Sequence, residues 1–188
     1  MGINPPKRRA TVLLSGGLDS AACAHFLQGQ GLSVSAVFVN YGQAAAVLEW
    51  RAAVAMAERL DLPLRTLSVT GGDQFGSGEL AGRNAFLVFA ALFLGRATPG
   101  LLAAGIHAGT PYYDCSEDFV ELIGRLVADS TDGRVSFLAP FVSWTKQDVY
   151  NYFVAASLPT KLTYSCEAGT DPPCGVCLSC GDRKALGC

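Results

Sequence analysis

The sequence predicts an α/β fold, in which an open, mostly parallel, doubly wound sheet is followed by a small cysteine-rich knuckle. Short apolar runs alternate with helical patterns along the chain, and this alternation favours parallel strands joined by crossover helices on both faces. Paired glycines close the first apolar run, which is typical of a strand that turns into a helix at a ligand-binding edge. We expect residues 1–158 to form the sheet domain and residues 159–188 a metal-binding segment of the same compact unit.

Three strands are predicted in the first half of the chain, at residues 11–15, 34–40 and 64–69, because each is a short apolar or β-rich run. Helical composition follows the first strand over residues 18–28. A second helix begins near Ala44, and its expected apolar face consists of Val47, Trp50, Val54, Ala57 and Leu60. The connection at residues 71–82 contains five glycines and is expected to be a loop.

The second half continues the alternation. Residues 84–94 predict a buried helix, since an apolar run of this length is uncommon in strands. Strands are expected at residues 101–106 and 135–138. Between them, an amphipathic helix is indicated by Phe119, Leu122, Ile123, Leu126 and Val127. A last short helix is expected at residues 146–155, with Thr145 as its N-cap.

Composition excludes several classes of protein. Of the 188 residues, 50% are hydrophobic and 16% charged, with a net charge of -2, so direct nucleic-acid binding through clustered Lys and Arg is not expected. The longest apolar run, residues 85–94, is too short to span a membrane. No export signal precedes the first strand, so we expect a cytoplasmic protein. Its surplus apolar surface should be buried in the core or against a partner subunit.

The most informative segment is Ser15-Gly16-Gly17-Leu18-Asp19-Ser20, at the end of the first predicted strand. Paired glycines let a phosphate approach the backbone, and the N-terminus of the following helix is an anion site. Asp19 is expected to cap that helix or to position magnesium, because its charge would repel a phosphate. No Walker lysine follows the loop, and the looser dinucleotide match at residues 76–81 lacks an adjacent strand. The alternative is a tight turn without a ligand.

Four cysteines, Cys166, Cys174, Cys177 and Cys180, gather near the end of the chain. Each C-x-x-C step lets two thiolates reach one ion, and four thiolates suit structural zinc. An iron–sulfur cluster is a second interpretation, and redox or catalytic thiols are a third. The separate Cys23 and Cys115 are expected to be buried apolar side chains.

The phosphate loop resembles that of the N-type ATP pyrophosphatases, or PP-loop superfamily, which cleave ATP between its α and β phosphates. Together with the cysteine tail it is similar to one family, the 7-cyano-7-deazaguanine synthases of queuosine biosynthesis, called QueC. The resemblance includes Tyr41-Gly42-Gln43, Gly82-Arg83-Asn84, Gly105, Tyr113-Asp114-Cys115, Ala139-Pro140-Phe141, Thr145-Lys146 and Arg183. It runs over nearly the whole chain.

The resemblance implies an ATP- and magnesium-dependent ligase. Such an enzyme adenylates the carboxylate of 7-carboxy-7-deazaguanine, releases pyrophosphate and AMP, and transfers the acyl group to ammonia; a second round converts the amide to the nitrile. Arg83 and Lys146 are the candidates to stabilise charge on the α-phosphate and the developing oxyanion, unless each forms only a surface salt bridge. Tyr41, Gln43, Asn84 and Asp114 are candidates for the base pocket, with a helix cap as the alternative role of Asp114.

The sequence also departs from the family pattern. Ala44, Ala45 and Ala46 occupy positions that usually carry basic residues or histidine, the segment from Gly105 to Tyr113 is short, and the segment before Arg83 is trimmed. A more open pocket would suit a larger acceptor, so a deazaguanine–protein conjugate is an alternative product. A non-catalytic nucleotide-binding module and a tRNA thiolase are two further hypotheses. Relatives are commonly dimeric, which implies a homodimer, with a protein partner also compatible.

Overall fold

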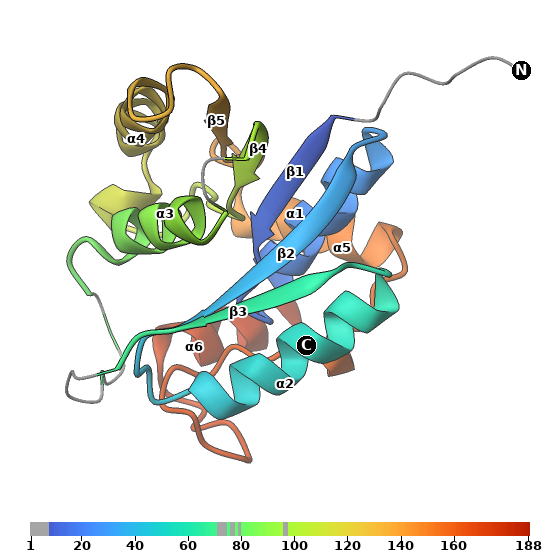
Figure 1. Ribbon diagram of the computed structural model, residues 1–188. Helices are drawn as coiled ribbons and strands as arrows, with labels where there is room; N and C mark the ends of the chain where they lie inside the picture. The colour runs from blue at the N-terminus through green and yellow to red at the C-terminus, as the bar shows by residue number, and fades with distance from the viewer. Residues whose placement is uncertain (1–7, 71–74, 76–77, 79, 96–97) are drawn as a thin grey trace, which may run out of the picture.

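The computed structural model describes residues 8–70, 75, 78, 80–95 and 98–188, and contains a five-stranded, fully parallel sheet (Figure 1). The strand order is β3-β2-β1-β4-β5. The strands are β1 (Arg9–Leu13), β2 (Ser33–Asn40), β3 (Leu64–Ser68), β4 (Gly100–Ala103) and β5 (Val135–Leu138). The first seven residues and most of the expected loop at 71–82, including Gly76 and Ser77 of the dinucleotide-like match, lie outside the described residues.

Helices cover both faces of the sheet, as the sequence predicted. The helices are α1 (Leu18–Gly29), α2 (Ala46–Arg59), α3 (Arg83–Leu94), α4 (Glu117–Asp129), α5 (Lys146–Ala155) and α6 (Leu178–Leu186), with short 3-10 turns η1 (Tyr113–Cys115) and η2 (Thr160–Leu162). Buried side chains of α1, α2 and α5 form one core with β1 and β2. A second core joins α3 and α4 to the other face. No described helix is long and apolar enough to cross a membrane.

The sheet has a topological switch point between β1 and β4, which are neighbours. From β1 the chain adds β2 and β3 on one side of this point, and from β4 it adds β5 on the other side. Ligands bind outside the carboxyl ends of parallel strands at such a switch point. The backbones come very close here: a Cβ added to Gly105 would lie 2.6 Å from the Asp19 carbonyl oxygen. Only glycine at position 105 therefore lets the chain after β4 pack against the first turn of α1.

The capping prediction for α5 is confirmed, and the capping device is larger than expected. Thr145 Oγ1 accepts from the Asp148 N–H at 3.1 Å, while Asp148 Oδ2 accepts from the Thr145 N–H at 3.0 Å. Such a reciprocal capping box satisfies two of the N–H groups that a helix start leaves free. It fixes the first turn of α5, and with it Lys146.

Three burial predictions were confirmed only in part. In α3, expected to be buried, only Val88 and Ala91 are buried, and Phe93 is 85% exposed, because an apolar helix on a sheet presents only one face to it. In α2, Ala57 of the expected face is buried, as is Leu60 just after the helix, but Val47 is exposed, and the other buried residues are Ala52, Ala53 and Met56. In α4, three residues of the expected apolar face are buried, Phe119, Ile123 and Val127. The other two, Leu122 and Leu126, are about half exposed.

Helix α6 was not predicted from the sequence. It carries Gly181 near its middle, and Cys180 is the one residue that it buries within its described span, so neither propensity nor an apolar stripe indicates it. The segment packs at the carboxyl edge of the sheet, where Leu178, Asp182 and Arg183 line the same cavity as the phosphate loop. The predicted knuckle thus forms one wall of the candidate site.

Candidate functional site

The loop from Ser15 to Ser20 connects β1 to α1 and is held by its own serines. Ser20 Oγ donates to the Gly17 carbonyl at 2.9 Å, and Ser15 Oγ donates to Ser20 Oγ at 3.2 Å. Gly17 is the N-cap of α1 and no described side chain caps this end, so the first N–H groups of the helix stay available to an anion. Leu18 is 3% exposed; its side chain belongs to the core, and only its backbone can serve a ligand.

Gly16 is required by its neighbours. Its φ is +83°, and a Cβ there would lie 2.4 Å from the Glu49 carbonyl oxygen in the first turn of α2. The carbonyl oxygen of Gly16 accepts from the Tyr164 N–H at 3.0 Å. The phosphate loop is therefore in contact with α2 on one side and with the C-terminal segment on the other.

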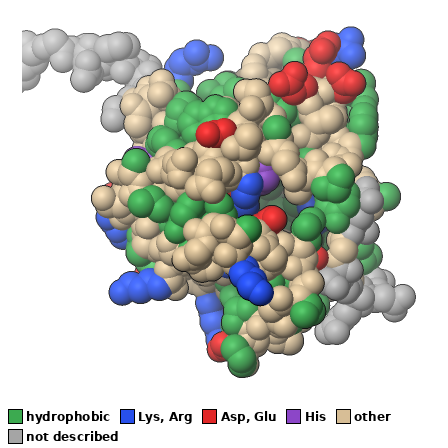
Figure 2. Space-filling view, turned by 180° about the vertical axis from the view of Figure 1, so that it is seen from behind, with side chains coloured by type: hydrophobic (Ala, Val, Ile, Leu, Met, Phe, Trp, Pro, Cys, Tyr) green, Lys and Arg blue, Asp and Glu red, His purple; other side chains and the backbone are tan. Residues whose placement is uncertain are grey.

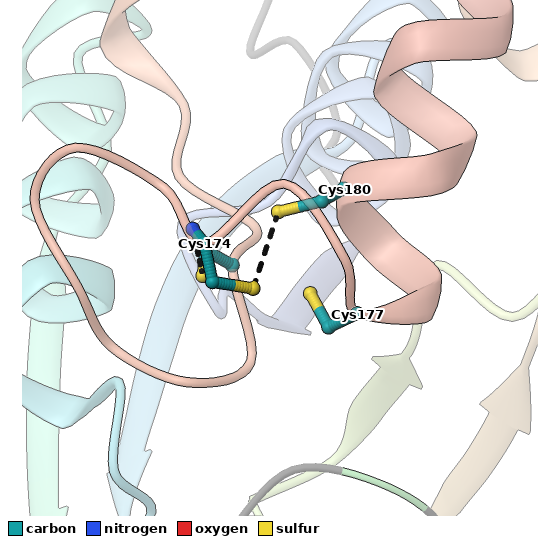
Figure 3. Close-up of side chains that lie close together, drawn as sticks. Cys174, Cys177 and Cys180 are labelled. Atoms are coloured by element: carbon teal, nitrogen blue, oxygen red, sulfur yellow. Dashed lines mark hydrogen bonds between the residues drawn. The ribbon is translucent and has the colours of Figure 1, made fainter.

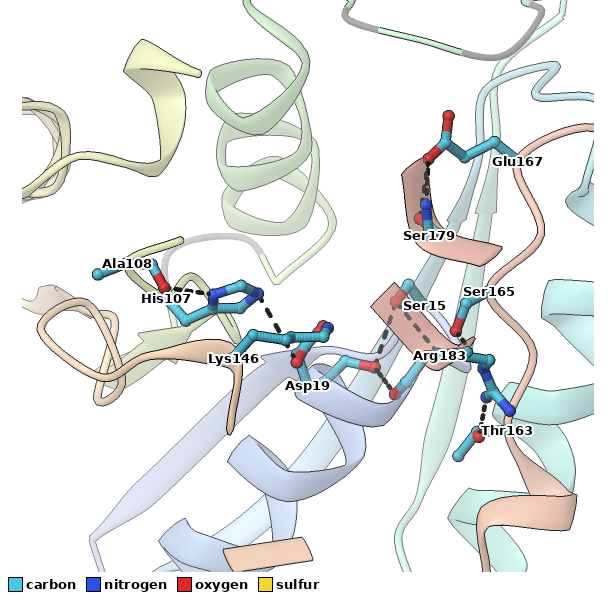
Figure 4. A network of polar contacts seen from close by, with 12 residues as sticks. Ser15, Asp19, His107, Ala108, Lys146, Thr163, Ser165, Glu167, Ser179 and Arg183 are labelled. Atoms are coloured by element: carbon cyan, nitrogen blue, oxygen red, sulfur yellow. Dashed lines mark hydrogen bonds and ion pairs between the residues drawn. The ribbon is translucent and has the colours of Figure 1, made fainter. Parts of the chain in front are cut away.

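Asp19 lies in the first turn of α1 beside two basic side chains (Figure 4). Lys146 Nζ donates to Asp19 Oδ2 at 2.5 Å. His107 Nε2 lies 3.8 Å from Asp19 Oδ1, a buried atom without a hydrogen-bond partner in the described structure. Asp19 does not cap α1, so of the two roles expected for it only the positioning of magnesium is left as a prediction.

His107 is 7% exposed and follows β4. Its Nδ1 lies 2.9 Å from the carbonyl oxygen of Ala108. Because a carbonyl oxygen only accepts, Nδ1 carries a hydrogen, and Nε2 faces Asp19. Sequence reasoning gave His107 no role, since a lone histidine has no spacing pattern that singles it out.

Tyr41 and Gln43 lie just after β2, and the Gln43 amide is fully engaged within the protein. Its oxygen accepts from the Tyr41 N–H at 2.9 Å, and its nitrogen donates to Glu49 Oε2 at 2.9 Å and to the Val39 carbonyl at 3.3 Å. Glu49 was not predicted as a site residue. Burial raises the pKa of its carboxyl, against the Gln43 hydrogen bond and the charge of Arg83, which both lower it.

Arg83 and Asn84 begin α3 and face η1. The Asn84 N–H donates to Asp114 Oδ2 at 3.2 Å, and Asn84 Nδ2 donates to the Asp114 carbonyl at 2.9 Å. Asp114 does not cap the helix after it, because Ser116 caps α4; it accepts instead at the start of α3. Burial raises the pKa of Tyr41, and Arg83 opposes this both by its charge and by a hydrogen bond to the phenol.

All these segments border one cavity of about 300 Å³. It is lined by residues of the phosphate loop, Tyr41, Gln43, Glu49, Arg83, Asn84, His107, Lys146 and Arg183. Asp114 is not part of this lining, although Asn84, to which it bonds, is. In Figure 2 the hollow contains basic, acidic and histidine side chains together.

The four predicted cysteine ligands come together; Figure 3 shows three of them, Cys174, Cys177 and Cys180. The Sγ atoms of Cys166, Cys174, Cys177 and Cys180 all lie within 4.8 Å of one another. Ligand sulfurs about 2.3 Å from a tetrahedral ion are spaced on this scale, so the donors fit a single metal ion. At Cys166, burial opposes ionisation, but hydrogen bonds from Cys174 and Thr170 prevail and lower the pKa to about 5.

Cys23 and Cys115, which were both expected to be buried, differ in their burial. Cys23 is fully buried in α1, and burial raises its pKa to about 12, so it behaves as the expected apolar side chain. Cys115 is only partly buried and lines the cavity. The prediction for Cys115 was therefore wrong, because η1 places the thiol at the open edge of the sheet.

A comparison with protein-family models matches residues 9–84 and 73–186 to the queuosine biosynthesis protein QueC. The chain belongs to the QueC family. Among curated QueC-family relatives, the 7-cyano-7-deazaguanine synthase of Methanoculleus marisnigri is 30% identical, over 94% of this chain and 92% of the relative. The synthase of Halobacterium salinarum is 31% identical, over 94% and 89%.

The first of these alignments extends over 205 residues, more than the 188 of this chain, so the relative has internal residues without a counterpart here. This agrees with the trimmed segments that the sequence indicates for this QueC-family chain.

Two solved structures share the overall α/β fold of this QueC-family chain. The U34-tRNA thiolase NcsA from Methanococcus maripaludis, solved with its [4Fe-4S] cluster, superposes with a TM-score of 0.52 at 14% identity, over 96% of this chain and 73% of that one. A predicted tRNA methyltransferase subunit from Methanocaldococcus jannaschii gives 0.50 at 13% identity, over 78% and 74%. At such identities the likeness concerns the fold alone.

Proposed function

We propose that the chain is an ATP-dependent ligase that adenylates the carboxylate of 7-carboxy-7-deazaguanine and transfers the acyl group to an amine. With ammonia the product is the amide, and a second ATP-dependent round gives 7-cyano-7-deazaguanine. One observation carries the proposal: the phosphate loop, the Lys146–Asp19 pair and Arg83 border the same cavity at the switch point of a QueC-family chain.

The chemistry explains why cations belong in this cavity. A carboxylate oxygen attacks the α-phosphorus, a new P–O bond forms, and the bond to the β-phosphate breaks with release of pyrophosphate. The amine then attacks the acyl carbon and loses a proton, and AMP leaves with the electrons of the C–O bond. Negative charge grows on the α-phosphate and on the acyl oxygen, and fixed donors aimed at such charge lower the barrier. Lys146 and Arg83 are the proposed donors.

The residues present also fit a magnesium ion. Asp19 Oδ1 is buried and has no hydrogen-bond partner in the described part of the chain, and a carboxylate oxygen beside phosphates is a usual ligand arrangement for Mg²⁺. Asp19 would hold the ion, which neutralises phosphate charge when bound. The four cysteines would hold zinc, whose role is structural because four thiolates leave no open position.

The substrate-binding residues divide into two groups. Tyr41 and Gln43, with Glu49, form the wall after β2; the Tyr41 ring is proposed to stack on the base. Asn84 and Asp114 hydrogen bond to each other, and we propose that this pair keeps α3 and η1 at the spacing that the base requires. Ser15 to Ser20 and the N-terminus of α1 would hold the pyrophosphate part of ATP.

A protein amine is a second candidate acceptor. The side chains of Ala44 and Ala46, just after β2, are small. They leave space that an acceptor larger than ammonia would need. Ala45 is 2% exposed, so it contributes no functional group to the rim.

The deciding experiment incubates the purified protein with ATP, Mg²⁺, 7-carboxy-7-deazaguanine and ammonium, and measures pyrophosphate release and product mass. We expect pyrophosphate and a mass that corresponds to the amide or nitrile. A parallel reaction with a candidate protein partner tests for a conjugate. Asp19→Asn should abolish release, whereas Asp129→Asn, at the far end of α4, should not.

The absence of pyrophosphate with this carboxylate, from protein that binds ATP, would overturn the proposal in favour of a non-catalytic nucleotide-binding module. Pyrophosphate release that depends on the carboxylate but yields only free AMP and unchanged carboxylate would show that the adenylate forms and is hydrolysed, and that the acceptor is neither ammonia nor the protein tested.

A further inference from the structure

Arg183, on the cysteine-rich segment, is a cation beside the phosphate loop. It lies in α6, three residues after the last cysteine of the cluster, and lines the same cavity as Ser15 and Gly17. Figure 4 shows its side chain next to the loop residues. Sequence reasoning included Arg183 in the family resemblance but gave it no role.

Two side chains hold the guanidinium in place. Arg183 Nε donates to Ser165 Oγ at 3.2 Å, and Nη2 donates to Thr163 Oγ1. Between them, the Tyr164 N–H donates to the Gly16 carbonyl at 3.0 Å. The segment that orients Arg183 is thus the same segment that contacts the phosphate loop, so the guanidinium has a fixed position relative to the loop.

The charge of Arg183 is not neutralised within the described structure. No carboxylate oxygen there lies within 4.0 Å of its guanidinium nitrogens; the ion pairs found are those of Asp19 with Lys146 and His107, and of Arg125 with Glu121. A partly buried cation without an anion is costly, and an arginine has five N–H donors suited to phosphate oxygens. Only two of its nitrogens bond to protein atoms among the described residues.

We propose that Arg183 binds the β- and γ-phosphates of ATP and stays on the pyrophosphate after the α–β bond breaks. This inference rests on the proposed function and deepens it, because it gives the cysteine-rich segment a task at the site: it carries the cation that holds the leaving group. Arg183 is distinct from Lys146 and Arg83, which are proposed to act on the α-phosphate and the acyl oxygen.

The test compares the dissociation constants of ATP and AMP, each with Mg²⁺, for the wild type and for Arg183→Gln. One lost charge-assisted contact should weaken ATP binding by about 10- to 100-fold, while AMP, which lacks both phosphates, should keep its affinity within about twofold. Arg183→Lys should show an intermediate loss for ATP and none for AMP.

Two controls separate phosphate binding from a structural role. Lys184→Gln removes a positive charge from the next, exposed position of α6 and should change neither constant. Thr163→Val removes one anchor of the guanidinium but keeps its charge, and should cost less ATP affinity than Arg183→Gln. Metal content and melting temperature are measured for each variant. If Arg183→Gln does not fold, the loss of ATP affinity relative to the loss of AMP affinity is measured with Arg183→Lys instead.

Equal losses of ATP and AMP affinity would overturn the inference, because they would show that Arg183 only holds the segment in place. Unchanged ATP affinity would overturn it as well. Neither measurement needs the deazaguanine, so a chain with the expected ATP-to-AMP ratio but no pyrophosphate release would contradict the proposed function alone.

Discussion

Lys146 Nζ donates to Asp19 Oδ2 at 2.5 Å and joins the first turn of α5 to the first turn of α1, across 127 positions of sequence. Each side chain is about one quarter exposed (26% and 25%), so the pair should add only about 1 kcal/mol or less to stability. Its value lies in placing a cation and a carboxylate at fixed positions beside the phosphate loop.

Lys146→Met should therefore separate catalysis from folding. We expect pyrophosphate release to fall by about 100-fold or more, as for the loss of one donor that stabilises transition-state charge, with a melting temperature within a few degrees of the wild type. Lys161→Met, at an exposed position of η2, is the matched control. A Lys146→Met enzyme that kept most of its rate would exclude this lysine from the reaction.

The two glycines of the phosphate loop should respond differently to alanine. Gly16→Ala places a Cβ 2.4 Å from the Glu49 carbonyl oxygen at a φ of +83°, so the variant should lose about 2 kcal/mol or more of unfolding free energy. At Gly17 the nearest atom to an added Cβ is Ser15 Oγ at 3.5 Å, and φ is −79°. Gly17→Ala should keep its stability in urea unfolding and lose ATP affinity, because the methyl group occupies the phosphate approach. Equal melting temperatures for the two variants would contradict this account.

The pH dependence of stability should carry a contribution from Glu49. Burial raises the pKa of its carboxyl above the ordinary value near 4.5, so its favourable contribution is complete below that value and is lost as the pH rises through the raised pKa. Glu49→Gln keeps an acceptor for Gln43 and avoids this loss. In urea titrations, the unfolding free energy of Glu49→Gln should increase relative to that of the wild type between pH 4 and pH 7. Glu58→Gln, at an exposed position of the same helix, should show no such trend. An unfolding free energy of the wild type that increases relative to that of Glu49→Gln with rising pH would contradict the predicted direction.

Metal removal should affect the C-terminal segment before the sheet. The last thirty residues bury few apolar side chains, whereas a structural zinc ion supplies on the order of 10 kcal/mol of folding free energy. Chelation, or Cys180→Ser, should make the chain after Leu158 sensitive to protease and weaken ATP binding, with the circular dichroism of the sheet largely retained. Cys188→Ser, outside the cluster, should behave as the wild type. Metal analysis with the visible spectrum tells zinc from an iron–sulfur cluster, and unchanged nucleotide affinity after metal loss would show that the segment does not support the site.

The sheet and the first five helices could be predicted because each has its own local pattern: an apolar run, a helical period or a capping residue. Helix α6 could not, since it forms on a frame of cysteines and contacts rather than on an apolar stripe. The turn from β1 to α1, where we propose that phosphate binds, could be located from its paired glycines between a strand and a helix. His107 and Glu49 were missed because each is a single residue whose significance depends on which strand end it meets.

The close approach of Gly105 to Asp19 has a consequence for changing what this protein accepts. Where the chain after β4 meets the first turn of α1, the main-chain atoms of Gly105 and Asp19 are packed too tightly to admit a side chain at position 105. Substitutions there would cost the fold before they altered selectivity. Variation in the acceptor is therefore expected away from this contact, at partly exposed lining positions such as Tyr41 and Tyr112.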